Sequence, residues 1–212
     1  MSKVVLFAAS LLLVAGIASA GIIDPCNSPV VYNGVEPECY FACPQGDTET
    51  FNQAGFSWSM VINDLIGQPI PDIPGSDFWL IDCDPVNNLA LCAGSASTAA
   101  DSATNDSGAT TMGDATLAAG GCADGLSMVV QGFVLGPAPG PGCPAYCWDI
   151  HVRTPDLDGD LAVTLVDLSI FATCYPPQPY DTCCDFDCSG LVNLQDLARF
   201  AFHFGPPGHE CQ

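Results

Sequence analysis

Basic residues are almost absent from this sequence. Its 212 residues contain 3 Lys and Arg against 24 Asp and Glu, which gives a formal net charge of −21 at pH 7. A field of this sign repels the phosphates of nucleic acids and of anionic membranes, so neither is expected as a partner. The same field attracts divalent cations.

Recognisable catalytic signatures are also missing. The sequence contains no nucleophile elbow, no zinc-protease motif and no phosphate-cradling loop. Of its three histidines, His151 lies in an alternating segment, His203 lies where a helix should end, and His209 lies in a Pro/Gly tail. A structural or surface role is the simpler interpretation for His151. The expectation is therefore that the protein is not an enzyme.

Long apolar runs are limited to the amino terminus. Val4 to Ala18 follows Lys3 and leads into the small-x-small site Ala18-Ser19-Ala20. This pattern predicts a Sec-type signal peptide over residues 1–20, cleaved near Ala20, and a protein that is secreted to the extracellular space or cell surface. The run is short for a transmembrane anchor and lacks a stop-transfer flank. No membrane insertion is expected, because no later stretch approaches a span.

Cysteine, in contrast, is abundant. All 13 cysteines follow the predicted signal peptide, and in a secreted chain this density indicates a disulfide framework. Zinc is the weaker alternative, because histidine is scarce and no paired C-x2-C spacing occurs. Cys83–Cys92 and Cys143–Cys147 are plausible local bridges. Since thirteen is odd, one thiol must be free, buried or bonded to another chain.

The chain up to residue 153 has the composition of β structure, with many Gly and Pro and few aromatic residues. Residues 21–50 form a Cys/Pro-rich lead-in with little periodicity. Residues 56–62 alternate as a half-buried strand does. Residues 93–119, rich in small and polar types, are expected to be a long loop or a solvated strand pair. Further strands are expected at 77–82, 126–134 and 146–152.

Two segments of this region resemble bacterial immunoglobulin-like surface domains. Residues 61–71 are similar to the pattern V-x-D-x-x-G-x-P-I-P, which opens many such domains, and residues 104–111 to a later T-D-x-x-G-x-A-T segment. The resemblance implies an immunoglobulin-like β-sandwich over residues 51–153, and hairpin turns joining alternating strands favour the same architecture. Asn105-Asp106-Ser107 is in addition a glycosylation sequon.

The last part of the chain contains an internal repeat. Residues 156–168 read D-L-D-G-D-L-A-V-T-L-V-D-L and residues 185–197 read D-F-D-C-S-G-L-V-N-L-Q-D-L, at an offset of 29 positions. The match continues through Phe171-Ala172 and Phe200-Ala201. Duplication of one supersecondary unit is the simplest explanation.

The spacing of oxygen-bearing residues in each copy predicts a calcium loop. A 12-residue loop supplies calcium with ligands from positions 1, 3, 5, 7, 9 and 12. Val163 and Val192 at position 8 are expected to pair as a short β contact, and the apolar residues after position 12 predict a helix. The ligands expected in loop one are Asp156, Asp158, Asp160, the Ala162 carbonyl, Thr164 and Asp167; those in loop two are Asp185, Asp187, Ser189, the Leu191 carbonyl, Asn193 and Asp196.

Neither loop has room for an entering helix, because Pro155 precedes the first and three prolines lie before the second. A loop followed by a single helix, present twice and with Asp at position 12, resembles the duplicated F-hand of dockerin domains. The resemblance implies that residues 154–212 form a small α dockerin-like module binding two Ca²⁺. In cellulosomal dockerins, positions 10 and 11 hold a Ser-Thr pair that contacts cohesin. Here these partner-binding positions are the more apolar Leu165, Val166, Leu194 and Gln195, so a cellulosomal partner is not implied.

The two loops differ in ways that predict unequal calcium affinities. Position 6 normally holds glycine because the turn needs a positive φ; loop two has Gly190 there, but loop one has Leu161. Loop two in turn has Ser189 in place of a carboxylate at position 5. It also contains Cys188, for which a bridge to Cys211 is one way to clamp the fold.

The function expected from these features is that of a secreted, calcium-binding structural or interaction protein. Its dockerin-like module would bind a cohesin-like or immunoglobulin-like domain, or another copy of the chain, and head-to-tail binding between copies would build a filament or surface layer. The competing hypothesis is a small carbohydrate-binding or hydrolytic module carried on a dockerin. Trp58, Trp79 and Trp148 would then form a stacking platform, although their apolar strand settings are typical of core positions.

Overall fold

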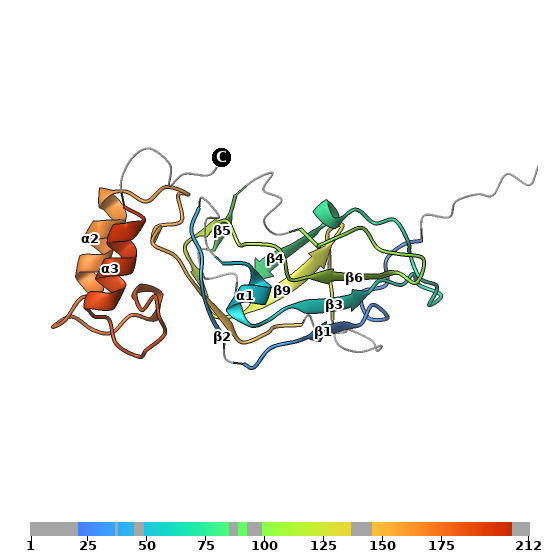
Figure 1. Cartoon of the computed structure of the whole chain (residues 1–212), viewed down its shortest axis with the longest axis horizontal. Helices are drawn as coiled ribbons and strands as arrows, with labels where there is room; N and C mark the ends of the chain where they lie inside the picture. Colours follow the sequence, from blue (N-terminus) through green and yellow to red (C-terminus); the bar gives the residue numbers. More distant parts are fainter. Residues whose placement is uncertain are drawn as a thin grey trace, which may run out of the picture.

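The computed structural model describes residues 21–36, 38–44, 49–84, 89–92, 99–136 and 146–204. The predicted signal peptide, Cys143, His209 and Cys211 lie outside these ranges. The described chain consists mainly of short strands with few helices (Figure 1), which confirms the predicted mainly β class. Within it, no helix is both long and apolar enough to cross a membrane.

The first sheet contains the segment with the clearest alternation. Strands β1 (Val30–Tyr32), β3 (Trp58–Val61) and β6 (Ala109–Met112) pair antiparallel in the order β1-β3-β6. Between residues 56 and 62 buried and half-buried side chains alternate without a break, as expected for a strand with one face on the core. β1 comes from the expected lead-in, so that stretch belongs to the sheet.

The second sheet contains a hairpin where the sequence suggested one strand. After the short 3-10 helix η1 (Gly75–Asp77), strand β4 (Phe78–Asp82) pairs with β9 (Leu126–Val130), and β9 pairs with β10 (Phe133–Val134). The single strand predicted at 126–134 is therefore wrong. Gln131 and Gly132 have φ of 48° and 88°, a backbone conformation that turns the chain between β9 and β10.

The third sheet joins distant parts of the chain. β2 (Glu38–Phe41) pairs parallel with β11 (Ile150–Arg153), which pairs antiparallel with β8 (Cys122–Ala123). β11 thus begins later than the strand expected at 146–152. A two-stranded pair, β5 (Ala90–Leu91) with β7 (Ala119–Gly120), and the one-turn helix α1 (Phe51–Ala54) complete this part.

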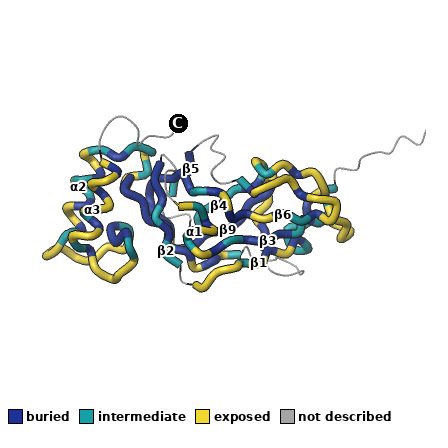
Figure 2. The backbone as a smooth tube through the Cα atoms, viewed as in Figure 1, coloured by how far each residue is buried: buried dark blue, intermediate teal, exposed yellow. Residues whose placement is uncertain are grey.

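One hydrophobic core fills the β-rich part. It contains buried residues from Ile23 to Val152, including the fully buried Trp58. The stretch 93–119 was expected to be a long loop or a solvated strand pair, but its described portion contains β6, and Met112, Leu117 and Ala119 are completely buried. β6 alternates in this stretch, with Thr110 and Met112 buried and Thr111 exposed, so one face of it lies on the core. Figure 2 shows the buried backbone concentrated in this part of the molecule.

A second, smaller core lies in the carboxy-terminal part. Helices α2 (Leu165–Cys174) and α3 (Leu194–Phe202) follow the two repeat loops as predicted, with the 3-10 helix η3 (Thr182–Cys184) between them. Phe171 stacks on Phe186 at 5.6 Å and on Phe200 at 5.7 Å between ring centroids. Val163 and Val192 are buried in this core but form no β bridge, contrary to expectation. Residues 154–204 are called the loop–helix module below; it lies at one end of the molecule, next to β2 (Figure 1).

Four disulfides join described cysteines, which confirms the predicted framework but not its pairing. The expected local bridges Cys83–Cys92 and Cys143–Cys147 are wrong, since Cys83 bonds Cys147 across 64 residues of sequence. The suggested Cys188–Cys211 bridge is also wrong, since Cys188 bonds Cys39. Strand pairing, which brings remote segments together, decides the partners. The four bonds are Cys39–Cys188, Cys83–Cys147, Cys122–Cys183 and Cys174–Cys184.

Candidate metal centres

The first repeat loop folds around the carboxylate at its position 1. Asp156 accepts hydrogen bonds from the backbone N–H groups of Gly159 (2.9 Å) and Leu161 (2.7 Å). Asp167 at position 12 closes the loop by accepting from Leu157 N (2.7 Å) and Thr164 N (2.7 Å). The carboxylates of Asp156, Asp158 and Asp167 each offer an oxygen, and these atoms lie within 4.8 Å of one another.

The second loop repeats most of this arrangement, although its position-4 N–H, that of Cys188, donates to the Asp185 carbonyl rather than to the Asp185 side chain. Asp185 accepts from Ser189 N (3.0 Å) and Gly190 N (2.7 Å), while Asp196 accepts from Phe186 N and Asn193 N, both at 2.8 Å. The carboxylates of Asp185, Asp187 and Asp196 form a matching group within the same 4.8 Å. The internal duplication seen in the sequence is therefore a duplication of geometry.

The position-12 carboxylates also start the helices. Thr164 is the N-cap of α2, with Asp167 at the third helical position, and the two make a reciprocal capping box. Asn193 and Asp196 do the same for α3. A capping box fixes the entry of the chain into the helix, so each helix holds the position-12 carboxylate of its loop in place.

Burial of the position-1 and position-12 carboxylates is the most unusual electrostatic feature of the module. Asp156, Asp167 and Asp196 have no exposed surface and Asp185 has 1%. Within the described chain no salt bridge reaches any of them. Arg153 pairs with Asp124, and Arg199 donates to the Phe186 carbonyl while lying over the Phe41 ring. Buried carboxylates normally have a cationic partner, because an unpaired buried charge is costly.

Burial shifts the pKa of two of these carboxyl groups, Asp156 and Asp196. Desolvation raises the pKa of Asp156 to about 7, and repulsion from Asp167 and Asp160 adds to it, against hydrogen bonds from Leu161 and Gly159 that lower it. Burial likewise raises the pKa of Asp196, with Asp187 and Asp185 adding to the effect. Without a cation, the ionised forms of Asp156 and Asp196 are therefore disfavoured.

Of the carboxylates predicted as ligands, three in each loop converge. The Asp160 carboxylate is exposed, accepts from Ala162 N (3.0 Å) and is not in the group of converging oxygens. Ser189 donates through its hydroxyl to the Leu191 carbonyl (3.2 Å). The donor set that converges is three carboxylates per loop, all hard oxygen ligands that suit Ca²⁺. The remaining predicted ligands, Ala162, Thr164, Leu191 and Asn193, lie along the same loops.

Backbone conformation at positions 4 and 6 is shared by the two loops. At position 4, Gly159 has φ of 72° and Cys188 has φ of 51°; at position 6, Leu161 has φ of 70° and Gly190 has φ of 83°. The positive φ expected at Leu161 is confirmed. The positive φ at position 4 was not predicted. Each loop therefore has one glycine and one non-glycine residue in the left-handed region.

Two contacts with the position-1 carboxylates were missed by sequence reasoning. The Tyr180 hydroxyl donates to Asp185 Oδ2 at 2.8 Å. Gly120 lies so close to Asp156 that a Cβ on this glycine would lie 2.6 Å from the Asp156 Cγ. Both contacting residues lie outside the repeated motif, so loop spacing gave no signal for them.

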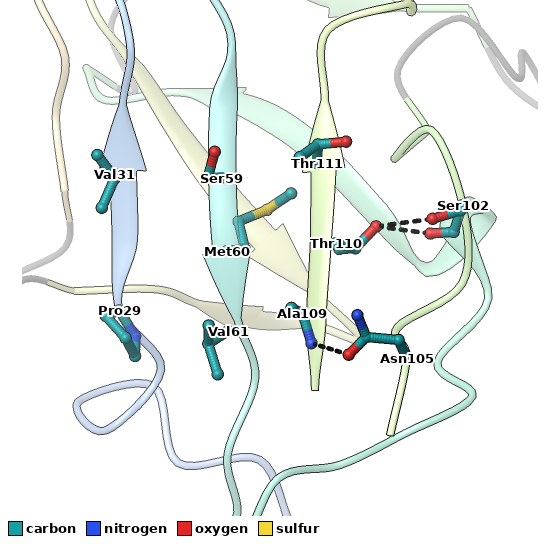
Figure 3. Close-up of a pocket in the computed structure, with 10 residues that line it drawn as sticks. All are labelled: Pro29, Val31, Ser59, Met60, Val61, Ser102, Asn105, Ala109, Thr110 and Thr111. Atoms are coloured by element: carbon teal, nitrogen blue, oxygen red, sulfur yellow. Dashed lines mark hydrogen bonds between the residues drawn. The ribbon is translucent and has the colours of Figure 1, made fainter. Parts of the chain in front are cut away.

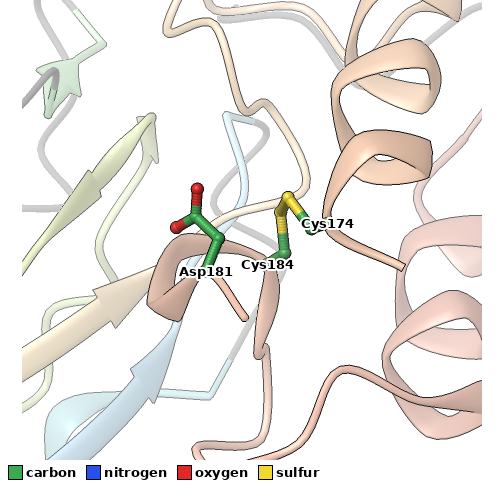
Figure 4. Close-up of side chains that lie close together, drawn as sticks. All are labelled: Cys174, Asp181 and Cys184. Atoms are coloured by element: carbon green, nitrogen blue, oxygen red, sulfur yellow. A yellow bond between two sulfur atoms is a disulfide. The ribbon is translucent and has the colours of Figure 1, made fainter. Parts of the chain in front are cut away.

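A third cluster in the module, Cys174, Asp181 and Cys184, is not a metal centre. Its two sulfurs are joined in a disulfide (Figure 4), and the bonded sulfurs are no longer thiolate ligands. Asp181 caps η3 by accepting from Cys183 N at 3.0 Å.

A pocket lies on the first sheet. It runs across the neighbouring strands β1, β3 and β6 (Figure 3), and none of its lining side chains is acidic, basic or a thiol. Thr110 donates to the Ser102 carbonyl (2.7 Å), and Asn105 accepts from Ala109 N (3.1 Å), which shapes the turn before β6. The lining residues are Pro29, Val31, Ser59, Met60, Val61, Ser102, Asn105, Ala109, Thr110 and Thr111.

The predicted partner-binding residues lie on the surface of the module. Leu165 is 71% exposed, Val166 53% and Leu194 70%, and Gln195 is exposed as well. Leu191, at position 7 of loop two, adds a further apolar side chain that is 67% exposed.

Comparison with known proteins returns no relative: no family model matches the chain, and no curated protein or solved structure matches it significantly.

Proposed function

We propose that this protein is a secreted, calcium-binding structural and interaction protein, and that its loop–helix module is dockerin-like and mediates protein–protein assembly. Two Ca²⁺ ions would bind, one in each loop, held by Asp156, Asp158 and Asp167 and by Asp185, Asp187 and Asp196. The ions would be the cationic partners that the buried carboxylates otherwise lack among the described residues. No bond is made or broken in this function.

The observation that carries the proposal is the pair of matching carboxylate groups. Four of the six carboxylates are buried, and within the described chain no basic side chain pairs with them. An isolated acidic turn would leave its charges in water. Here the carboxylates converge within each loop and backbone N–H groups hold them in place, so a hard dication would find its oxygen ligands already grouped.

A calorimetric calcium titration of the secreted chain tests this proposal. We expect two ions per chain in two steps of unequal affinity, because loop one has the additional acid Asp160 and loop two has Ser189 at that position. D167N should remove the loop-one step and D196N the loop-two step. Absence of calcium binding by the wild-type chain would refute the proposal.

An exposed apolar surface supports the assembly role. Leu165, Val166, Leu191 and Leu194 lie in or next to the two loops and are each more than half exposed. Exposed apolar side chains that gather on a protein surface commonly mark interaction sites. Because calcium would fix the conformation of both loops, it would also fix this surface, which we assign to a cohesin-like or immunoglobulin-like domain or to a second copy of the chain.

Size-exclusion chromatography distinguishes these partners. If the chain binds its own copies, the elution volume in calcium should decrease with concentration, and chelator or the double variant L165D/L194D should return it to that of a monomer. A monomer at all concentrations in calcium would leave a different protein as the partner. A pull-down of secreted proteins in calcium and in chelator would then identify it.

The β-rich part supports an immunoglobulin-like sandwich in one respect. The two segments that resemble such domains lie side by side: Ile62 N donates to the Gly108 carbonyl at 2.9 Å, and the Thr104 hydroxyl donates to the Ile70 carbonyl at 2.8 Å. Gly108 has φ of 71°, and a Cβ there would collide with the Ile62 carbonyl. We therefore propose this architecture for residues 51–153.

The tryptophan side chains expected to form a carbohydrate-stacking platform are not exposed together. Trp58 is fully buried and Trp148 is 6% exposed, and the two rings pack edge to face at 5.7 Å within the core. Trp79 is half-buried, so the three rings do not form an exposed platform. No second function is therefore proposed.

A further inference from the structure

We infer that the β-rich part of the chain completes the two calcium loops: Gly120 positions the Asp156 carboxylate of loop one, and the Cys39–Cys188 disulfide positions loop two. This inference rests on the proposed calcium binding. The positioning residues lie far from the repeat in sequence. The module is therefore a part of the whole protein rather than a detachable unit.

Gly120 provides the space that the Asp156 side chain occupies. It ends strand β7, and a Cβ at this position would overlap Asp156 Oδ2 and lie 2.6 Å from its Cγ. A methyl group here must displace the carboxylate, because Asp156 is fully buried and its oxygens are already bonded to Gly159 N and Leu161 N. Any displacement therefore also disturbs the loop backbone.

Hydrogen bonds attach the start of loop one to the same β segment. Gly121 N donates to the Asp156 carbonyl at 2.6 Å. The buried Thr154 hydroxyl lies 2.7 Å from the Gly121 carbonyl and 2.8 Å from the Asp156 carbonyl. Asp156 is thus held through its main chain as well as its side chain, and β7 fixes the position of the first ligand.

Loop two is attached to a different strand by a covalent bond. Cys188 is position 4 of the loop and bonds Cys39 of β2. Two residues further along β2, Phe41 packs edge to face on Phe186 at 5.7 Å between centroids, and the Arg199 guanidinium lies over the Phe41 ring. β2 therefore contacts loop two on both sides of Asp187.

The physical consequence is preorganisation. A ligand that is already held in its binding position loses less conformational entropy when the ion arrives, and residues outside the first coordination shell typically change metal affinity about 10- to 100-fold when altered. Since the two loops depend on different β contacts, their affinities should respond separately to changes in β7 and β2.

Calorimetric titration of G120A with calcium chloride tests the loop-one half of the inference. We expect the loop-one step to weaken about 10- to 100-fold, with the loop-two step unchanged. The matched control is G113A, whose added methyl would meet the exposed Asn52 side chain, far from the module in sequence. It should leave both steps as in the wild type. If G120A binds calcium like the wild type while the wild type binds two ions, the inference fails and the proposed function stands.

A double variant covers the case in which G120A does not fold. If the collision with Asp156 is the cause, D156A should relieve it, and G120A/D156A should be as stable as D156A alone, a non-additivity that a double-mutant cycle measures. If G120A/D156A is less stable than D156A, the role given to Gly120 is overturned. In calcium-free G120A that does fold, the amides of Gly159 and Leu161 should exchange faster, with Gly190 unchanged.

The loop-two half is tested with C39S/C188G. Glycine at position 188 keeps the positive φ of 51° available, so the variant removes the disulfide without adding backbone strain. The loop-two step should weaken about 10-fold or more and the loop-one step should remain. C83S/C147S, which removes a disulfide confined to the β-rich part, is the control and should leave both steps in place. Wild-type affinity at loop two in C39S/C188G would overturn this half.

Discussion

Single residues in the left-handed region set the shape of the two loops. Each loop needs a positive φ at positions 4 and 6, and each satisfies one of the two with glycine: Gly159 in the first and Gly190 in the second. A non-glycine residue in this region costs on the order of 1–2 kcal/mol. Because Leu161 and Cys188 are both in this conformation, backbone strain is similar in the two loops. The expected difference between their calcium affinities must therefore come from charge.

Replacement of Gly190 tests the backbone requirement free of steric effects, since a Cβ at this position would have no neighbour within 4 Å. We expect G190A to lower the free energy of unfolding by about 1 kcal/mol and to weaken the loop-two calcium step. G190N should lose less, because asparagine tolerates positive φ better than alanine does. Urea denaturation in calcium measures both variants. If G190A and G190N lower the free energy of unfolding equally, the positive φ of Gly190 is not the cause of the loss.

Among the β elements, the junction of β8 and β11 depends on a buried charge. Arg153 of β11 has a side chain that is 3% exposed; it donates to the Ala123 carbonyl and forms a salt bridge of 2.5 Å with Asp124. Asp124 also contacts His151 Nδ1 at 3.0 Å. Burial raises the pKa of Asp124, but hydrogen bonds with His151 and Arg153 and the Arg153 charge outweigh it, so the net pKa is lowered.

The lowered pKa of Asp124 gives a defined pH dependence. The stabilisation from ionised Asp124 is present above its ordinary pKa and is lost as the pH falls through the lowered folded-state value. We expect D124N to cost about 1 kcal/mol near neutral pH, since solvent screens the exposed half of the carboxylate. The difference from wild type should shrink as the pH falls from about 5 to about 3.

The matched control for D124N is D149N. Asp149 is similarly exposed and contacts the other ring nitrogen of His151 at 3.2 Å, but no salt bridge to Arg153 is found among the described residues. Its replacement should cost less than about 0.5 kcal/mol. Urea denaturation across the pH range compares the three proteins. A D124N effect that stays constant down to pH 3 would contradict the assigned role.

At the scale of the whole molecule, excess negative charge is the dominant property. Against 24 acidic residues, the basic side chains that the structure describes are Arg153 and Arg199, and both already have partners in the fold. The two disulfides Cys39–Cys188 and Cys122–Cys183 join the loop–helix module to the β-rich part. Repulsion between carboxylates in the module therefore acts on the stability of the entire protein.

Removal of calcium should consequently destabilise the whole chain. An ion that binds only the folded state adds about 2.7 kcal/mol per site at 100 times its Kd, so we expect a higher Tm in calcium than in chelator. Sodium chloride should raise the Tm of the chelated protein more than that of the calcium-loaded protein, because it screens charges that calcium has already neutralised. Thermal unfolding followed by circular dichroism measures this, and magnesium is the control cation. The same Tm in calcium and chelator would contradict the expectation.

The sequence by itself determined the features that depend on local spacing. The repeat at an offset of 29 residues predicted two similar loops, each followed by a helix, and the structure contains both helices. Alternation at residues 56–62 predicted a strand, because period-two burial is a property of a single strand. The charge imbalance and the cysteine content likewise follow from composition alone.

Only the tertiary structure decided which distant residues meet. The pairing of Cys39 with Cys188, the parallel contact of β2 with β11 and the fit of Asp156 against Gly120 each join segments tens of residues apart or more. No local pattern encodes such contacts, because they arise when many strands optimise their packing together. The sequence specifies which side chains each loop contains, and the folded β-rich part determines where they are held.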